Sequence, residues 1–220
     1  MTADTGSTGA VSTATIIAWL TVFRDLVTAN NAYLTELDSA IGDADHGSNM
    51  TRGMDAVVAQ VGSVAPESIA ELFTSAGMTL VKTVGGASGP LYGTFFLRCG
   101  SATPAGATQL DSTAFGTCLR AGLEGVVARG KAQAGDKTMF DAMAPALAAY
   151  DQTVGRGASL SAAGVAAAVA AATGRDNTEP LVAKKGRASY LGDRSVGHID
   201  PGSASTTLLF EALARALSDT

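Results

Sequence analysis

The sequence predicts an all-α fold of about eight helices. Apolar residues recur every three or four positions in one segment after another, which is the spacing that places them on one face of a helix. No stretch alternates convincingly between apolar and polar residues with the period of two that is typical of a half-buried strand. Glycine, proline and helix-capping residues separate the apolar segments. We therefore expect amphipathic helices joined by polar loops that carry the chemistry.

Length and charge limit the classes of protein to which the chain can belong. Its 220 residues fit one large domain with a substantial core. The formal net charge of −5 argues against a general nucleic-acid or membrane-surface binder, because such proteins carry a basic excess. No apolar run approaches the roughly 18 residues of a membrane span, and the N-terminus lacks the features of a signal peptide. We expect a cytoplasmic protein.

The helices are expected in the following order. Residues 1–12 are small and polar, and we expect them to form a disordered tail before a single domain at residues 13–220. Helical spacing then marks the segments Ile16–Val27, Tyr33–Ile41, Met50–Val61, Ile69–Leu80, Leu91–Cys99, Phe115–Val126, Met139–Tyr150, Ser161–Ala172 and Leu208–Leu217. Cys99 and Cys118 share no metal-ligand spacing, which favours buried free thiols.

The stretch from Asp38 to Asn49, D-S-A-I-G-D-A-D-H-G-S-N, contains three carboxylates and neither lysine nor arginine. Its carboxylates end one helix and continue into a loop, so they can converge on Mg²⁺, which also binds phosphate oxygens and water. A solvated acidic turn explains the same spacing equally well. A calcium EF-hand is excluded, because Ser48 stands where glycine is required and Met54 where the bidentate glutamate belongs.

Two neighbouring features fit phosphate binding without proving it. His46 lies between Asp45 and a helix N-terminus, where backbone N–H groups attract anions. It suits a metal ligand, a phosphate contact or a catalytic acid, and equally a structural hydrogen-bonding role. The run Gly85–Gly89 resembles phosphate-binding loops in composition, but no strand precedes it, and an interhelical turn is the commoner explanation.

Two further loops are rich in glycine and charge. The run G-K-A-Q-A-G-D-K-T at residues 130–138 is not a P-loop, because Asp136 separates the second glycine from the lysine and no strand comes first. Residues 184–202 carry four of the chain's 15 basic residues, and Arg187 and Arg194 suit bidentate phosphate contacts. A solvated basic loop is an equal explanation. Together the loops suggest Mg²⁺-nucleotide binding on a helical scaffold.

Four long segments resemble the nucleotide-binding L subunit of dihydroxyacetone kinase. They read L-D-S-A-I-G-D-A-D-H-G-S-N-M, G-G-A-S-G-P-L-Y-G-T-F-F, R-G-K-A-Q-A-G-D-K-T-M and A-K-K-G-R-A-S-Y-L-G-D-R-S-V-G-H-I-D-P-G, in the order that this family has. The resemblance implies a closed antiparallel barrel of eight amphipathic helices with the nucleotide held by interhelical loops at one end. Asp193 departs from the glutamate expected there, and the alanine-rich segment 161–172 looks diverged; neither concerns an expected ligand.

The resemblance also assigns the site. Asp38, Asp43 and Asp45 would hold two Mg²⁺ ions that bridge the phosphates of ADP or ATP. The nucleotide would be bound by His46, Gly47, Ser48, Asn49, Ala87, Ser88, Gly130, Met139, Arg187, Asp200, Pro201 and Gly202. Among these, Gly130 and Met139 would line the adenine and ribose side. Arg187 and the 200–202 turn would close over the nucleotide.

The function implied is phosphoryl transfer to dihydroxyacetone held on a separate K subunit. ADP would be a bound coenzyme rephosphorylated by an M subunit of the phosphotransferase system, or ATP would exchange as an ordinary substrate; the sequence leaves both open. It also leaves open a tetrose acceptor, an ADP-state sensor that binds a transcriptional regulator, and a homodimer. A helical domain of a fatty-acid kinase fits less well, because such domains are normally fused to a lipid-binding part absent here. Neither nucleic acid nor membrane is an expected partner.

Overall fold

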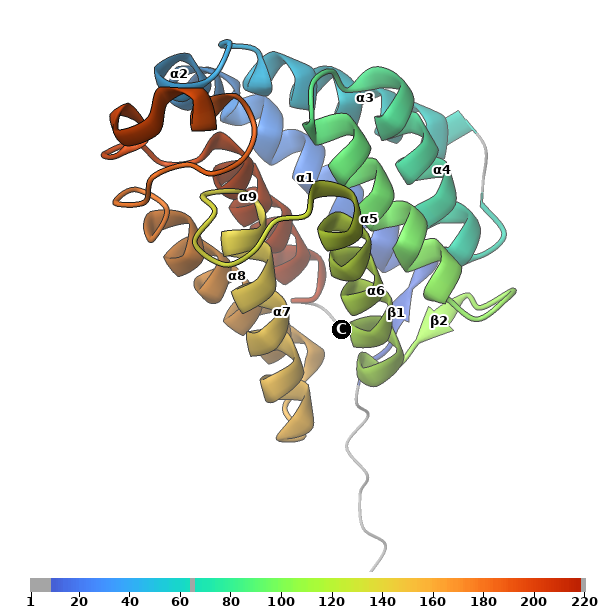
Figure 1. The fold of residues 1–220 in the computed structure, drawn as a ribbon. Coiled ribbons are helices and arrows are strands. Elements are labelled where there is room, and N and C mark those ends of the chain that lie inside the picture. The colour runs from blue at the N-terminus through green and yellow to red at the C-terminus, as the bar shows by residue number, and fades with distance from the viewer. Residues whose placement is uncertain (1–8, 64–65, 219–220) are drawn as a thin grey trace, which may run out of the picture.

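The computed structural model describes residues 9–63 and 66–218, and this part of the chain is mostly helical (Figure 1). Its α-helices are α1 (Thr13–Ala29), α2 (Asn31–Ile41), α3 (His46–Ser63), α4 (Ile69–Thr83), α5 (Ser88–Ala102), α6 (Ser112–Gly130), α7 (Phe140–Gly155), α8 (Leu160–Asp176) and α9 (Pro201–Ala216). A 3₁₀ helix, η1, spans Arg187–Ser195, and two short strands are β1 (Val11–Ser12) and β2 (Gln109–Leu110). The prediction of a mainly helical fold is confirmed.

Side-chain caps explain where several helices begin. The Ser12 hydroxyl accepts a hydrogen bond from the Thr15 N–H, and the Thr15 side chain accepts one from the Ser12 N–H, so the two residues form a capping box before α1. Ser68, Asp111, Ser159 and Asp200 cap α4, α6, α8 and α9 in the same way, each accepting from a backbone N–H three residues later.

The helices pack in sequence around a common apolar core. Each helix from α3 to α8 packs on the next one, α9 also packs on α1, and α1 packs on α3. Trp19 is fully buried near the rings of Phe73, Phe96 and Phe115, and its Nε1–H donates to the Leu209 carbonyl at 2.8 Å. This contact ties α1 to α9, the first and last α-helices of the described chain.

Some details differ from the predictions. Residues 1–8 of the predicted tail lie outside the described residues, but Val11 and Ser12 belong to the fold, because β1 pairs antiparallel with β2 and Val11 is buried. A two-residue strand is too short to produce a visible period of two. In α2 the buried apolar residues are Leu34 and Ile41, whereas Tyr33, which was predicted to be buried, is 39% exposed. Cys99 and Cys118 are buried free thiols, as predicted.

The turn at Asn30 separates α1 from α2, as the separate segments Ile16–Val27 and Tyr33–Ile41 indicate, and the described residues form nine α-helices where about eight were expected. Within the basic loop predicted to be irregular, the nine residues of η1 adopt a 3₁₀ helix interrupted at Gly192. No helix in the described ranges combines the length and the apolarity needed to cross a membrane.

Candidate nucleotide and metal site

The loops at one end of the helices enclose a cavity of about 490 Å³. Its walls come from the α2–α3, α4–α5 and α6–α7 loops and from residues 185–202, which lie at the same end of the molecule (Figure 1). All the predicted site residues except Gly47 and Ser48 line it: Asp38, Asp43, Asp45, His46, Asn49, Ala87, Ser88, Gly130, Met139, Arg187, Asp200, Pro201 and Gly202. Segments distant in sequence therefore share one cavity.

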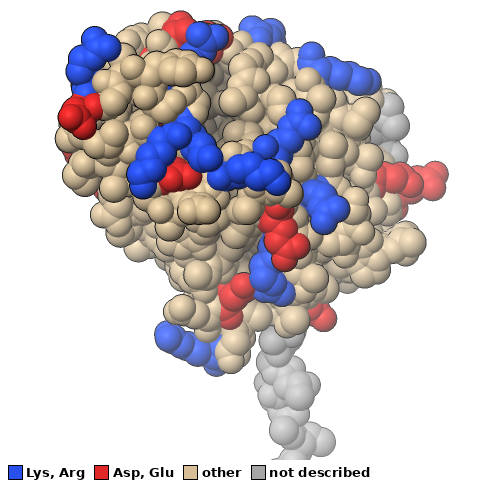
Figure 2. All heavy atoms as spheres, in the orientation of Figure 1, with Lys and Arg blue, Asp and Glu red and all other residues tan. Residues whose placement is uncertain are grey.

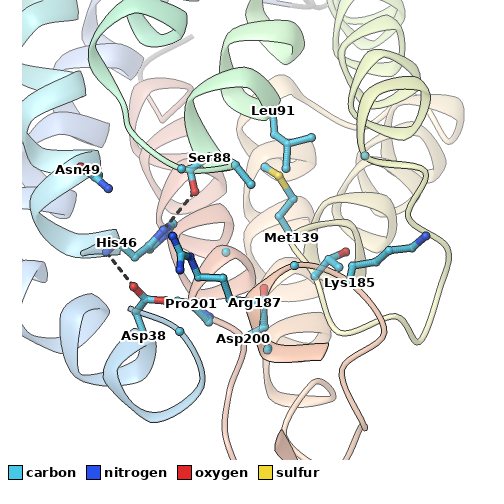
Figure 3. A pocket seen from close by; sticks show the side chains of 18 of the residues that line it. Asp38, His46, Asn49, Ser88, Leu91, Met139, Lys185, Arg187, Asp200 and Pro201 are labelled. Atoms are coloured by element: carbon cyan, nitrogen blue, oxygen red, sulfur yellow. Dashed lines mark hydrogen bonds between the residues drawn. The ribbon is translucent and has the colours of Figure 1, made fainter. Parts of the chain in front are cut away.

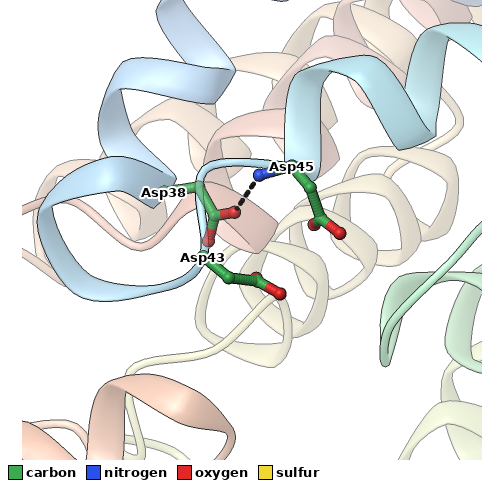
Figure 4. Close-up of side chains that lie close together, drawn as sticks. All are labelled: Asp38, Asp43 and Asp45. Atoms are coloured by element: carbon green, nitrogen blue, oxygen red, sulfur yellow. Dashed lines mark hydrogen bonds between the residues drawn. The ribbon is translucent and has the colours of Figure 1, made fainter.

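The three carboxylates gather at one edge of this cavity (Figure 4). One oxygen from each of Asp38, Asp43 and Asp45 lies within 4.8 Å of the others, close enough to share a cation. Asp38 is buried, and its Oδ2 accepts hydrogen bonds from the Asp45 N–H at 2.9 Å and the His46 N–H at 3.1 Å. These bonds hold the loop against the end of α2. Oxygen ligands in this arrangement suit Mg²⁺.

Two local features make this close approach feasible. Gly42 has no side chain, and a Cβ there would lie 2.0 Å from Asp38 Oδ1. Ala44 adopts a left-handed conformation with φ of 63°, which turns the chain between the two loop carboxylates. The sequence D-S-A-I-G-D-A-D therefore folds so that the helix-end carboxylate faces the two that follow.

Three helix N-termini bring partial positive charge to the cavity, opposite in sign to the carboxylates. α3 begins at His46, α5 at Ser88 and α9 at Pro201, and the first residue of each lines the cavity. The first N–H groups of a helix lack intrahelical partners and favour anions. A phosphate chain is therefore a suitable occupant of the space between these helix starts and the carboxylates.

Gly47 and Ser48 do not line the cavity, although both lie in the first turn of α3. A Cβ on Gly47 would lie 2.2 Å from the Asn31 carbonyl, so this glycine packs directly against α2. The Ser48 hydroxyl donates to the Asp45 carbonyl at 2.9 Å, and the side chain is exposed. Any contact of these two residues with a ligand would have to come from their backbone N–H groups.

His46 connects the carboxylate edge to the α4–α5 loop. Its Nδ1 lies 3.2 Å from the Ser88 hydroxyl, a contact drawn in Figure 3, and its Nε2 lies 2.9 Å from the Ser205 hydroxyl. Burial lowers the pKa of His46, although the neighbouring Asp38 and Asp45 oppose this shift. The neutral imidazole is thus favoured in the absence of a ligand.

The other side of the cavity is apolar. Leu91 and Met139 lie next to each other in Figure 3, and Val126 and Ala132 line the same cavity. Gly130 allows its backbone to approach Leu91 closely, since a Cβ there would lie 3.2 Å from Leu91 Cδ2. An apolar wall beside an anion-binding edge fits a planar base with attached phosphates.

Residues 184–202 form a closing segment along one wall of the cavity. Arg187 extends from it toward the His46 side (Figure 3), and its Nη2 lies 2.9 Å from Asp43 Oδ2. Figure 2 shows lysine and arginine side chains gathered across the face seen in Figure 1, with acidic side chains between them. Although the whole chain is acidic, positive charge therefore surrounds the loops near the cavity.

Asp200 lies at the base of the closing segment and caps α9. Its Oδ2 accepts from the Ser203 N–H at 2.6 Å, and its own N–H donates to Thr178 Oγ1 at 3.0 Å. Burial raises the pKa of Asp200 to about 7, although the Ser203 hydrogen bond favours the ionised form. Asp200 therefore titrates near neutrality, at the edge of the cavity.

The ammonium group of Lys137 donates to backbone carbonyls, which agrees with the exclusion of a P-loop. Its Nζ donates to the carbonyls of Glu179, Leu181 and Ser195 at 3.2, 3.0 and 2.6 Å. The side chain is buried, although the residue also borders the cavity. Lys137 thereby fastens the closing segment and the chain before it to the α6–α7 loop.

Sequence reasoning missed several residues of the wall, including Ile41, Leu91, Tyr92, Val126, Arg129 and Lys185. Leu91 and Val126 belong to apolar helix faces, so periodicity assigns them to the core. Their place in the sequence could have indicated them, because each of these two residues lies within one helical turn of a glycine-bearing loop. Arg129 and Lys185 carry no local signal beyond their charge.

Comparisons with known proteins agree with this site. The family model of the DAK2 domain matches residues 40–215. The chain is 43% identical to the ADP-binding subunit DhaL of the PEP-dependent dihydroxyacetone kinase of Escherichia coli K12, over 93% of this chain and 97% of that protein. It is 41% identical to the ADP-binding subunit DhaL of the PTS-dependent dihydroxyacetone kinase of Lactococcus lactis, with the same two coverages.

Longer relatives and a solved structure share the same region. The L-erythrulose 1-kinase of Mycolicibacterium smegmatis is 34% identical over 92% of this chain but only 35% of its own length. The crystal structure of the dihydroxyacetone kinase from C. freundii in complex with AMP-PNP and Mg²⁺ matches 98% of this chain and 36% of that chain, with a TM-score of 0.72 and 25% identity. The chain therefore belongs to the DAK2 domain family and, within it, to the DhaL-type ADP-binding subunits of dihydroxyacetone kinase.

Proposed function

We propose that this chain is the nucleotide-binding subunit of a dihydroxyacetone kinase and passes a phosphoryl group from its nucleotide to dihydroxyacetone held on a separate K subunit. One observation carries the proposal: three carboxylates within 4.8 Å of one another share a cavity with the starts of α3, α5 and α9. The 43% identity to an ADP-binding DhaL subunit, over nearly its full length, supports this choice.

The proposed ligand is ADP or ATP with two Mg²⁺ ions. Asp38, Asp43 and Asp45 would hold the ions, which when bound supply positive charge against the phosphate oxygens. Backbone N–H groups at the starts of α3 and α5 would meet the phosphates, and the wall of Leu91 and Met139 would receive the base. Phosphoryl transfer depends mainly on positioning and charge neutralisation, and these residues would provide both.

The finer architecture is part of the same proposal. The circuit of packed helix pairs from α3 through α9 to α1 supports a closed antiparallel barrel, with the nucleotide at one end. The acceptor would then reach the nucleotide through the mouth of the cavity, beside Arg187 and Lys185.

We favour ADP as a bound coenzyme that an M subunit of the phosphotransferase system rephosphorylates. The relatives that this chain matches over nearly their whole length are PEP- or PTS-dependent kinases by name. The L-erythrulose kinases are nearly three times as long as the matched region, so an ATP-dependent tetrose kinase has less support. A cytoplasmic location and work with K and M subunits belong to this proposal.

Reconstitution tests the proposal and its phosphoryl donor. The chain is mixed with a K-type subunit and dihydroxyacetone, and dihydroxyacetone phosphate is measured with either phosphoenolpyruvate and the phosphotransferase proteins or excess ATP. We expect repeated turnover only with the first donor system. Repeated turnover on ATP without an M-type protein would eliminate the coenzyme role. Retained ADP binding without transfer from any donor would instead favour a sensor.

A further inference from the structure

A line of polar side chains leads from the cavity into the core between α3, α5 and α9. Ser88 Oγ lies 3.2 Å from His46 Nδ1, and His46 Nε2 lies 2.9 Å from Ser205 Oγ. Ser205 Oγ lies 2.7 Å from the Tyr92 hydroxyl, which also contacts Thr206 Oγ1 at 3.0 Å. Ser205, Thr206 and Tyr92 are fully buried. The line therefore joins Ser88, His46 and Tyr92, which line the cavity, to the hydroxyls of Ser205 and Thr206, which do not.

One backbone carbonyl determines the direction in which the Ser205 hydroxyl donates. The Ser205 hydroxyl also lies 3.1 Å from the Gly202 carbonyl, which can only accept. Because a serine hydroxyl has one hydrogen, donation to Gly202 leaves Ser205 Oγ to accept from His46 Nε2 and from Tyr92. This arrangement favours a hydrogen on Nε2 of His46.

We propose that Ser205, supported by Tyr92, is a positioning residue that holds the His46 ring with its hydrogen on Nε2 and its Nδ1 turned to the Ser88 hydroxyl. Ser88 then donates to Nδ1 and presents oxygen lone pairs, rather than its hydrogen, to the cavity. Phosphate oxygens only accept hydrogen bonds, so they would be met by the backbone N–H groups at the start of α5. The Ser88 side chain would accept from a donor such as a water bound to Mg²⁺.

The alternative is that these buried hydroxyls only stabilise the core. Matched variants separate the two roles. Ser205→Ala and Tyr92→Phe remove the hydroxyls next to His46. Thr207→Val and Tyr150→Phe remove buried hydroxyls that bond elsewhere: Thr207 Oγ1 donates to the Ala171 and Ser203 carbonyls, and the Tyr150 hydroxyl donates to the Ser112 carbonyl. Each control variant should lower stability without removing a hydroxyl that contacts His46, Ser205 or Tyr92.

The first measurement is ¹⁵N NMR of the histidine rings in the full chain without ligand. The chain has two histidines, and the exposed His198 serves as an internal reference that His198→Gln assigns. We expect a single Nε2–H tautomer for His46 in the unsubstituted chain and a mixture in Ser205→Ala. An Nδ1–H tautomer in the unsubstituted chain would overturn the inference before any variant is made.

The second measurement is the dissociation constant of Mg·ADP, and this step rests on the proposed nucleotide function. We expect Ser205→Ala to weaken binding about tenfold, a loss of the size seen when the partner of a ligand-holding histidine is removed. Tyr92→Phe should weaken it less, and Thr207→Val and Tyr150→Phe should leave it unchanged. If Ser205→Ala loses stability but keeps the tautomer and the affinity, the positioning role is wrong. Absence of Mg·ADP binding in the unsubstituted chain would instead reject the proposed function.

Discussion

Arg187 and Asp43 form an ion pair across the mouth of the cavity, with 2.9 Å between Nη2 and Oδ2. The pair joins the closing segment to one of the three carboxylates of the candidate metal site. A cation at this site would use the same carboxylate. Arg187 and such an ion would therefore compete for Asp43 until a phosphate group gave the guanidinium another partner.

The first prediction concerns this competition. Arg187→Gln should strengthen the binding of Mg²⁺ alone, because Asp43 is then no longer paired with the Arg187 guanidinium. The same variant should weaken Mg·ADP binding by about tenfold or more, since a hydrogen bond to a charged group contributes roughly 1.5–3 kcal/mol. Isothermal titration with each ligand measures the two effects. Arg194→Gln, an exposed change in the same η1 segment, is the control, and equal losses in both variants would contradict the assignment.

The second prediction concerns the carboxylates themselves. Asp43→Ala should abolish the Mg²⁺-dependent part of ADP binding and leave the fold intact, because the side chain is exposed and such changes usually alter stability by less than about 0.5 kcal/mol. ADP titrations with Mg²⁺ or with a chelator measure the dependence. Asp55→Ala, which removes an exposed carboxylate from α3, should bind normally. Tight Mg²⁺-dependent binding by Asp43→Ala would reject the metal site.

The third prediction uses Gly42, which allows the carboxylates to converge. A methyl group at this position would lie 2.0 Å from Asp38 Oδ1, so Gly42→Ala must displace that carboxylate. We expect Mg²⁺-dependent ADP binding to fall by an order of magnitude. In the control Gly62→Ala nothing lies within 4 Å of the added methyl, and this exposed change near the end of α3 should leave ADP binding unchanged. Unchanged binding in Gly42→Ala would show that Mg²⁺-dependent ADP binding does not depend on the position of the Asp38 carboxylate.

The carboxylate site could be predicted from the sequence because it is local. Asp38 lies in the last turn of α2, and the other two carboxylates follow within seven residues, so helical geometry and one loop bring them together. The apolar wall could not be predicted in this way. Leu91 and Met139 belong to segments that meet only through the packing of whole helices, and each carries the same periodic signal as an ordinary core residue.

The interaction partners of the charged loop residues could not be predicted from the sequence either. Composition indicates that residues 184–202 are basic, yet it does not indicate that Arg187 meets Asp43 or that Lys137 is buried. Lys137 adopts a left-handed conformation with φ of 62°, which is uncommon outside glycine, and its side chain binds carbonyls more than 40 residues away. These pairings depend on the tertiary fold, which periodicity does not describe.

The fourth prediction follows from Lys137. Lys137→Met keeps the apolar stem but leaves the carbonyls of Glu179, Leu181 and Ser195 without their shared donor. We expect a loss of about 2 kcal/mol in the free energy of unfolding. Urea titration followed by the fluorescence of Trp19, the single tryptophan, measures this loss. Lys131→Met is the control, because that residue is also left-handed in the same loop but exposed. Equal stability of the two variants would contradict the fastening role.

The fifth prediction concerns pH and Asp200. Because burial raises its pKa to about 7 in the folded chain, the folded state binds a proton that the unfolded chain releases near pH 4. The contribution of Asp200 to stability is therefore fully present below about pH 4 and is lost as pH rises through about 7. Asp200→Asn keeps a residue that caps helices well and removes the ionisation.

We expect Asp200→Asn, without ligand, to show a flatter dependence of unfolding free energy on pH between about 4 and 7, and to gain stability relative to the unsubstituted chain above pH 7. Urea titrations at a series of pH values measure both effects. Asp111→Asn, which changes the exposed cap of α6, is the matched control and should keep the original dependence. A parallel pH profile in Asp200→Asn would mean that this carboxylate does not titrate near neutrality.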